Sequence, residues 1–414
     1  MGDNIVGERA LLVIGAGLET IPGLQRAMAM GLHLVATDGN ADAPGRQHVD
    51  DFLHVSTYNV EATMRAVWHY NDTVRPIHGV MALAADVPLT VASVAHLLGL
   101  PGAGLDTAIL TSDKVAMKNR LRKVGVPIPW YASVKNVEHL HLLYAACRWP
   151  LVLKPVDSRG ARGVLRLTPD VDLSWAYAYS RQFSPTGRVM VEEYLPGPQL
   201  STESVLCDGW VRTPGFIDRN YARLDAYAPH FLEDGGSQPT VLSAQERDAV
   251  CRVAEQAALA LGITHGTAKG DLVLTPEGPK VIEMAARLSG GWMSSVQVPL
   301  ATGIDLVGAA IRLALSETVT SGEVAPPQDQ RGVAIRYCFP TPGRVVRITG
   351  VDDAQALPCV HDVKLFTRVG ETLPLVTNHT QRAGCVIAAG ATCDEAVACA
   401  ERAVAMIHIE TETV

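Results

Sequence analysis

Two carboxylates are expected to face each other across one hairpin of the chain. The segment KGDLVLTPEGPKVIE, residues 269–283, reads as two apolar strands joined by the turn TPEGP, whose Pro and Gly suit a tight reversal. In simple register Asp271 faces Glu283 and Leu274 faces Lys280. Carboxylates about 5 Å apart at Cβ destabilise a hairpin unless a cation neutralises them. The apolar neighbours imply partial burial and favour a hard divalent cation, whereas a surface ion network is the purely structural alternative.

Two basic residues stand close to these acids. Lys269 precedes Asp271 by two positions and therefore shares its face of the strand, and Arg287 follows Glu283. Mg²⁺ held by two carboxylates usually completes its coordination with substrate phosphates. The hairpin therefore predicts a nucleoside triphosphate, and the rest of the sequence should supply its binding site.

A glycine-rich loop is the first candidate for phosphate binding. PLVLKP places Lys154 at the end of an apolar strand, directly before VDSRGARGV. The backbone amides around Gly160 and Gly163 can approach phosphate oxygens closely, and Arg159 and Arg162 add positive charge.

Two more segments fit the same ligand. Lys114 lies in the first turn of an expected helix, where the helix dipole disfavours a cation, so a functional role is favoured. VMVEEYLPG ends a strand and continues into a Pro-Gly hinge, whose exposed backbone groups can pair with a purine edge. Each signal is weak alone, because a single lysine is usually solvated.

The elements that must position these residues change in character along the chain. In residues 10–100 short apolar strands (ALLVIGAG, HLVATD, DFLHVST, IHGVMAL) alternate with helices and predict a parallel sheet covered on both faces. A helix is expected to begin near Ser112 or Asp113 and end at Gly125. PLVLKP, GVLRLT, RVMVEEYL and TESVLCDGWV read as strands around the helix DLSWAYAYSRQF, and Ser243 with Glu246 predicts a capping box. After the linker VTSGEVAPPQDQRG, further strands and a last helix form a third unit.

Composition narrows the function classes. The 414 residues are 48% hydrophobic with a formal charge of −8, which argues against a nucleic-acid partner. No apolar run approaches the length of a membrane span. The eight cysteines show no C-x-x-C pair, so reduced, mostly buried thiols in a cytoplasmic protein are expected.

A partial dinucleotide fingerprint competes with the triphosphate reading. Gly15 and Gly17 follow a strand, and Asp38 lies about twenty residues later, but Thr20 stands where the third glycine belongs. The pattern leaves open an NAD oxidoreductase or a plain strand-to-helix turn.

The order of five features along the chain resembles the ATP-grasp superfamily. These features are Lys114, Lys154, the glycine-rich loop, the EEYLPG hinge and the carboxylate hairpin. The C-terminal segments AIRYCFPTPGRV, VGETLP and RAGCVIAAG are similar to the C-terminal domain of L-amino-acid ligases. The resemblance implies an α/β and α+β chain with a Rossmann-like domain (1–112), an ATP-grasp domain (113–325, lid about 130–195) and a C-terminal β-rich unit (330–414).

The resemblance also assigns roles by position. It implies ATP contacts from Lys114, Lys154, Ser158, Arg159, Gly160, Gly163, Glu192, Glu193, Leu195 and Gln199, with Glu192 at the adenine amino edge and Gln199 where a ribose-binding acid often lies. It implies Mg²⁺, or Mn²⁺, on Asp271 and Glu283, catalytic roles for Arg287 and Lys269, and substrate contacts from His230, Glu233, Gly290 and Gly291.

Three positions depart from the family pattern. The second acid is usually followed by Asn and Arg as Glu-x-Asn-x-Arg, but Ala285 replaces the Asn. Asp271 replaces a more usual Glu, and Lys269 stands where a His is common. One metal ion is then held more loosely, or Lys269 takes over part of its charge.

The expected reaction is ATP-dependent activation of a carboxylate to an acyl phosphate, followed by amide formation with an amine. The alternatives are an enzyme that activates bicarbonate, as carboxylases and carbamoyl-phosphate-type enzymes do, and a non-catalytic nucleotide-binding protein. The expected partners are small molecules, and a homodimer is expected by analogy alone.

Overall fold

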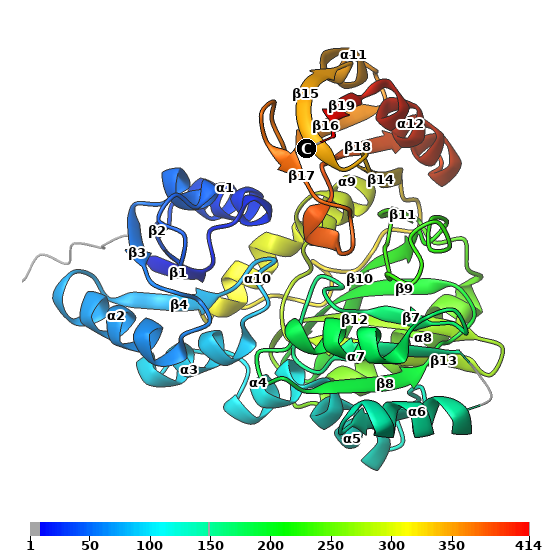
Figure 1. Cartoon of the computed structure of the whole chain (residues 1–414). Helices are drawn as coiled ribbons and strands as arrows, with labels where there is room; N and C mark the ends of the chain where they lie inside the picture. The colour runs from blue at the N-terminus through cyan, green and yellow to red at the C-terminus, as the bar shows by residue number, and fades with distance from the viewer. Residues whose placement is uncertain (1–8, 148–149, 414) are drawn as a thin grey trace, which may run out of the picture.

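The computed structural model of the chain describes residues 9–147 and 150–413. The first eight residues of the expected N-terminal domain and the last residue of the C-terminal unit lie outside this range. Figure 1 shows an N-terminal lobe in blue and cyan, a middle region in green and yellow, and a C-terminal lobe in orange and red. No helix within the described ranges has the length and apolar character needed to cross a membrane.

The N-terminal lobe contains a parallel four-stranded sheet with the order β3-β2-β1-β4. Its elements are β1 (Ala10–Ile14), η1 (Leu18–Thr20), α1 (Ile21–Ala29), β2 (His33–Asp38), η2 (Pro44–His48), β3 (Asp51–His54), α2 (Val60–Thr73), β4 (Ile77–Met81), α3 (Pro88–Leu98) and α4 (Leu105–Ser112). Strand β1 is buried along its whole length, as expected of a parallel strand covered on both faces. The predicted Rossmann-like architecture is confirmed.

A small antiparallel sheet follows, with the order β5-β8-β6-β7. Helix α5 (Lys114–Lys123) leads into it, and the side chain of Asp113 caps this helix by accepting from the Ala116 N–H. The sheet and its helices are β5 (Tyr131–Val134), α6 (Val137–Ala146), β6 (Leu151–Pro155), β7 (Leu165–Leu167), α7 (Leu173–Gln182) and β8 (Val189–Glu193). These elements occupy the range in which the lid was expected.

The largest sheet has eight strands, in the order β13-β12-β9-β10-β11-β14-β18-β16. Its middle-region elements are β9 (Gln199–Cys207), β10 (Trp210–Arg219), β11 (Gly236–Gln238), α8 (Ala244–Ala260), β12 (Gly266–Thr275), β13 (Gly278–Ala285), η3 (Met293–Gln297), α9 (Val298–Thr302) and α10 (Leu306–Ala314). The predicted capping box of Ser243 and Glu246 opens α8.

The C-terminal lobe extends this sheet with β14, β18 and β16 and also forms a three-stranded sheet of its own, in the order β17-β15-β19. Short strand β11 pairs with β14, and β14 pairs with β18. The lobe consists of β14 (Gly332–Cys338), β15 (Gly343–Thr349), α11 (Val351–Gln355), β16 (Val360–Leu365), β17 (Thr372–Leu373), η4 (His379–Gln381), β18 (Gly384–Gly390), α12 (Cys393–Met406) and β19 (His408–Glu412).

Two local expectations are wrong. The segment TESVLCDGWV is not one strand, because the chain reverses at Asp208 and Gly209, both with positive φ, between β9 and β10. The cysteines are not all free thiols: Cys359 and Cys399 form a disulfide in the C-terminal lobe. The other six are free, as expected.

Candidate active site

A cavity of about 740 Å³ opens between the lobes. All three lobes contribute to its lining: Gly15, Glu19 and Asp86 from the N-terminal lobe, Lys114, Lys154, Glu192, Lys269, Asp271, Glu283 and Arg287 from the middle region, and Tyr337, Phe366, His379 and Arg382 from the C-terminal lobe. The expected site residues therefore meet in one place, with two exceptions, Gly163 and His230.

The carboxylate hairpin forms with the predicted register at its two acids. Asp271 on β12 pairs with Glu283 on β13, and Lys269 pairs with Ala285. The simple register fails further along, because a bulge between Asp271 and Leu272 shifts the pairing by one residue and places Val273, not Leu274, opposite Lys280.

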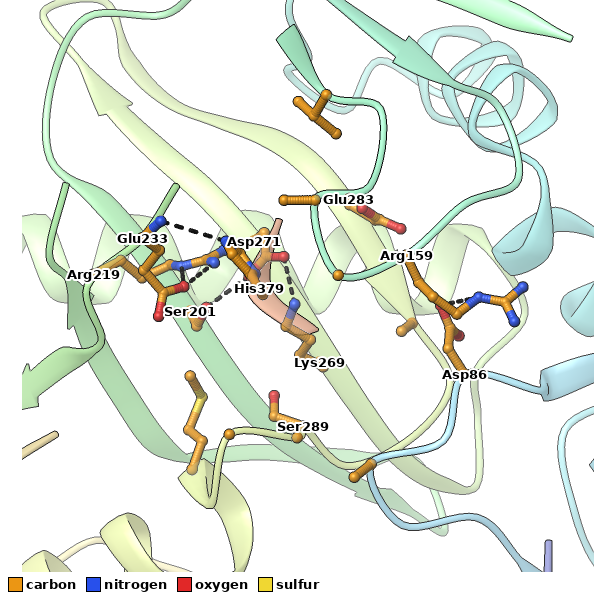
Figure 2. A pocket seen from close by; sticks show the side chains of 18 of the residues that line it. Asp86, Arg159, Ser201, Arg219, Glu233, Lys269, Asp271, Glu283, Ser289 and His379 are labelled. Carbon is orange, nitrogen blue, oxygen red and sulfur yellow. Dashed lines mark hydrogen bonds and ion pairs between the residues drawn. The ribbon is translucent and has the colours of Figure 1, made fainter. Parts of the chain in front are cut away.

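Asp271 is surrounded by donors from its own protein. Its Oδ1 accepts from Ser201 Oγ at 2.6 Å and lies 3.1 Å from Arg219 Nη1, while its Oδ2 is bound by the Lys269 ammonium. Burial alone would raise the pKa of this carboxyl, but Lys269 and Arg219 outweigh burial and hold the pKa well below its usual range. Figure 2 shows this cluster on one side of the pocket.

Glu283 is held by a different cation. Nζ of Lys114 lies 3.0 Å from Oε1 of Glu283 and donates to the carbonyl of Ser158 at 2.7 Å. Lys114 is thereby aimed at the base of the glycine-rich loop, where a phosphate would lie. The Glu283 side chain is 27% exposed, against 14% for Asp271, so Glu283 is the more accessible of the two acids.

A buried triad lies on the nucleotide side of the cavity. Oε1 of Glu192, on β8, accepts a hydrogen bond from the ammonium of Lys154. Nζ of Lys118 lies 2.9 Å from Oε2 and forms an ion pair with it, but the angles are not those of a hydrogen bond. Burial lowers the pKa of Lys118 to about 8. Both oxygens of Glu192 are thus engaged by ammonium groups.

The glycine-rich loop joins β6 to β7 on the rim of the cavity. Ser158, Arg159 and Gly160 line the cavity, but Gly163 does not. A Cβ on Gly163 would lie 2.9 Å from Cγ of Pro155, so this glycine serves close packing of the loop against the lid. Glu193, Leu195 and Gln199 line the cavity on the hinge side, as expected.

Asp86 connects the N-terminal lobe to two arginines of the site. Its Oδ1 lies 3.4 Å from Nε of Arg287, and its Oδ2 lies 3.9 Å from Nε of Arg159. Burial alone would raise the pKa of Asp86, but Arg287 and Arg159 outweigh it and lower the pKa. The guanidinium of Arg159 also lies over the ring of Tyr58, 4.5 Å from its centroid. The glycine-rich loop is thus attached to the N-terminal lobe.

Glu233 is enclosed by cations on the substrate side. Nε of Arg219 donates to Glu233 Oε2 at 2.8 Å, and Nη1 of Arg382 lies 3.9 Å from Oε1. The Glu233 N–H donates to Nε2 of His379 at 3.4 Å. Burial, followed by the charge of Arg382, lowers the pKa of His379 to about 3, so this ring is neutral and can accept that bond.

His230, Gly290 and Gly291, expected to contact the substrate, have different surroundings in the structure. His230 is not among the cavity-lining residues; its ring packs against Tyr179 and Trp175, so the structure does not support its substrate role. Gly290 and Gly291 do line the cavity, but the Gly291 N–H already donates to the carboxylate of Glu19, at 2.7 Å. This amide is therefore engaged by a carboxylate of the N-terminal lobe.

The N-terminal glycine pattern has a structural explanation. The two oxygens of Asp38 accept from the Ala16 N–H and the Asn40 N–H, each at 2.9 Å. Gly15 has φ +101° and its Cβ would lie 2.9 Å from that of Ala85. The acid that would hold a ribose in a dinucleotide site instead fixes the turn.

Several residues in or next to the cavity belong to no motif that the sequence displays: Glu19, Asp86, Lys118, Glu203, Arg219, His379 and Arg382. Only Lys118 left a usable signal, because it follows Lys114 by four residues and so shares its helix face. Glu203 on β9 is fully buried and accepts from the Ser289 N–H, and burial raises its pKa to about 7.

The donor set fits a nucleotide and one metal ion. Lys114, Lys154 and the loop at residues 158–162 surround space suited to phosphates, and Glu283 offers an accessible carboxylate next to it. Among the described residues, no three His, Cys, Asp or Glu side chains group as a metal site. Mg²⁺ commonly needs only one or two carboxylates beside substrate phosphates.

Three family models match the chain. An ATP-grasp N-terminal domain matches residues 24–102, an ATP-grasp domain matches residues 111–291, and the L-amino acid ligase C-terminal domain 2 matches residues 336–412. The matches follow the order of the three lobes.

Individual proteins give a consistent picture. An uncharacterized protein, y4rH, of Sinorhizobium fredii is 28% identical over 80% of this chain and 68% of its own length. A formate-dependent phosphoribosylglycinamide formyltransferase of Burkholderia cenocepacia is 25% identical over 96% of this chain and 95% of its own. The crystal structure of an L-amino acid ligase from Bacillus licheniformis superposes with a TM-score of 0.84 at 23% identity, covering 98% of this chain and 99% of that chain.

Proposed function

Because the chain belongs to the ATP-grasp superfamily, we propose that it is an ATP-dependent carboxylate-amine ligase. It joins a carboxylic acid or amino acid to an amine through an acyl phosphate and releases ADP and phosphate. The observation that carries this proposal is the convergence of Lys114, Lys154, Glu283 and Arg287 on one cavity lined by all three lobes. The match of residues 336–412 to an L-amino acid ligase domain supports the choice of reaction.

Nucleotide binding is assigned to the lid side of the cavity. The adenine lies against the hinge backbone at Glu193 and Leu195, and the phosphates lie between Lys114, Lys154 and the loop at Arg159 and Gly160. Buried cations next to phosphates act in a medium of low dielectric, where each attraction is stronger than in water. The lid sheet covers the reaction and keeps water from the acyl phosphate.

The chemistry takes place where Arg287 and Lys269 face the cavity. An oxygen of the substrate carboxylate bonds to the γ-phosphorus, and the bond from phosphorus to ADP breaks. The amine nitrogen then bonds to the carbonyl carbon, the carbon–oxygen bond to phosphate breaks, and the proton lost by the nitrogen passes to the departing phosphate. Arg287, held by Asp86, stabilises the negative charge that develops in both steps. Mg²⁺, when bound at Glu283, would neutralise phosphate charge.

The wider assignment follows from this reaction. ATP with Mg²⁺ is the cofactor, small molecules are the partners, and the cytoplasm, which supplies ATP, is the proposed location. Residues 113–325 bind the nucleotide, and residues 1–112 and 330–414 complete the walls around the acid and the amine.

The deciding experiment measures ADP release from ATP and Mg²⁺ with a pooled set of acids and amines, followed by mass measurement of the product. We expect release that requires both an acid and an amine, and a product mass equal to their sum minus water. Release that depends on bicarbonate would favour a carboxylase-type reaction instead. Nucleotide binding without release with any pool would refute the ligase function and leave a nucleotide-binding protein.

A further inference from the structure

We propose that the ammonium group of Lys269 takes the place of one metal ion beside Asp271, so that the site binds a single divalent cation, held by Glu283 and the nucleotide phosphates. This inference rests on the proposed function, because it assumes that the nucleotide binds in the same cavity.

The first argument is the occupancy of Asp271. A carboxylate offers about four lone-pair positions. Ser201 and Lys269 donate hydrogen bonds to Oδ1 and Oδ2 of Asp271, and the Arg219 guanidinium faces Oδ1 as an ion pair at 3.1 Å, which leaves the second position on Oδ2. A divalent ion on the remaining position would lie next to the ammonium bound to the same oxygen. Like charges at such distances repel strongly in a partly buried site, so this carboxylate is satisfied by its own protein.

The second argument is the register across three strands. Lys269 pairs with Glu203 on β9 and with Ala285 on β13, and Asp271 pairs with Ser201 and Glu283 in the same way. The methyl group of Ala285 provides no ligand atom. It also leaves room for the long side chain of Lys269, which is only 19% exposed.

The third argument is the contrast between the two acids. Glu283 shares Oε1 with one ammonium, that of Lys114, which is also bound to a carbonyl. Its side chain is nearly twice as exposed as that of Asp271. A metal ion therefore finds an accessible carboxylate at Glu283 and a neutralised one at Asp271. The fixed charge of Lys269 then acts at the substrate side of the hairpin, where Arg219 and Glu233 also lie (Figure 2).

The test counts bound Mn²⁺ by the loss of the free-ion electron paramagnetic resonance signal, with the full chain and adenylyl imidodiphosphate. We expect one Mn²⁺ per chain. In Lys269→Met the ammonium is removed while most of the side-chain length is kept, and we expect a second Mn²⁺. In the double variant Lys269→His with Ala285→Asn, ligand atoms are added at both positions, and two Mn²⁺ are expected with higher affinity.

A matched control is Lys123→His, which introduces the same imidazole at an exposed position at the end of α5 and should keep the count at one. Calorimetric binding of the nucleotide analogue identifies variants that still fold. Two Mn²⁺ in the wild-type chain would overturn the inference while leaving the ligase function intact. A count of one in every folded variant would remove the role assigned to Lys269. No nucleotide binding by the wild-type chain would overturn the proposed function together with this inference.

Discussion

Oδ1 of Asp86 lies 3.4 Å from Nε of Arg287, so a residue just after the last strand of the N-terminal sheet holds an arginine that follows the carboxylate hairpin. The same carboxylate faces Arg159 of the glycine-rich loop. Asp86 therefore helps to position two cations that line the cavity, and it connects the N-terminal lobe to the glycine-rich loop.

The variant Asp86→Asn should lower kcat about 10- to 100-fold, because misplacing a catalytic group by about 1 Å has effects of this size. The KM for ATP should change much less, since Lys114 and Lys154 remain in place. Steady-state ADP release measures both constants. Asp329→Asn, at an exposed position in the linker, is the matched control and should behave as wild type. Equal kcat in both variants would show that Arg287 does not depend on Asp86.

The buried carboxylate of Glu192 predicts a large effect on stability. Glu192→Gln removes the one negative charge that Lys118 and Lys154 share. Losing one partner of a buried ion pair costs about 3–5 kcal/mol in the free energy of unfolding. Urea-induced unfolding should show this loss. In Glu193→Gln the neighbouring side chain is partly exposed and lies 4.0 Å from Lys280, so the loss should stay below about 1 kcal/mol.

The succession of strands and helices along the chain and the type of each lobe could be predicted from the sequence, because they depend on local patterns. The buried run of β1 and the capping box of α8 are signals within a few residues. The continuous eight-stranded sheet was not predictable, since it depends on β11, three residues long. The disulfide joins cysteines 40 residues apart, and their spacing carries no local signal.

The residues expected to contact ATP could be singled out in the sequence because they lie in short motifs, and all of them except Gly163 line the cavity. The remaining site residues come from segments remote in sequence: Asp86 lies 201 residues from Arg287, and the Glu233 N–H meets a histidine 146 residues later. Such contacts depend on how the lobes pack. The bulge after Asp271 likewise could not be predicted from the hairpin sequence.

Glu203 predicts a pH-dependent stability. Burial raises its pKa from 4.5 to about 7, so the folded chain binds a proton that the unfolded chain releases near pH 4.5. This stabilisation is complete below pH 4.5 and is lost as the pH rises to about 7. The variant Glu203→Gln lacks the titration and keeps an acceptor for the Ser289 N–H. Relative to wild type, it should gain up to about 3 kcal/mol between pH 4.5 and 8.

Urea unfolding of both chains at several pH values measures this difference. Glu246→Gln, in the exposed capping box of α8, is the control for a carboxylate whose pKa is lowered, not raised. A constant difference between Glu203→Gln and wild type over the whole range would contradict a protonated Glu203.

The two glycines of the lid loop should differ when replaced by alanine. Both have positive φ, +64° at Gly160 and +72° at Gly163, which costs a non-glycine residue about 1–2 kcal/mol. The Cβ of Gly163→Ala would also lie 2.9 Å from Pro155 and 3.0 Å from Phe183, and such overpacking adds about 1–3 kcal/mol. The Cβ of Gly160→Ala meets only Thr380, at 3.4 Å.

Gly163→Ala should therefore lower the free energy of unfolding more, while Gly160→Ala, in the cavity lining, should mainly weaken nucleotide binding. Urea unfolding and calorimetric titration with adenylyl imidodiphosphate separate the two effects, and the reverse ranking would show that Gly160, not Gly163, anchors the loop to the lid.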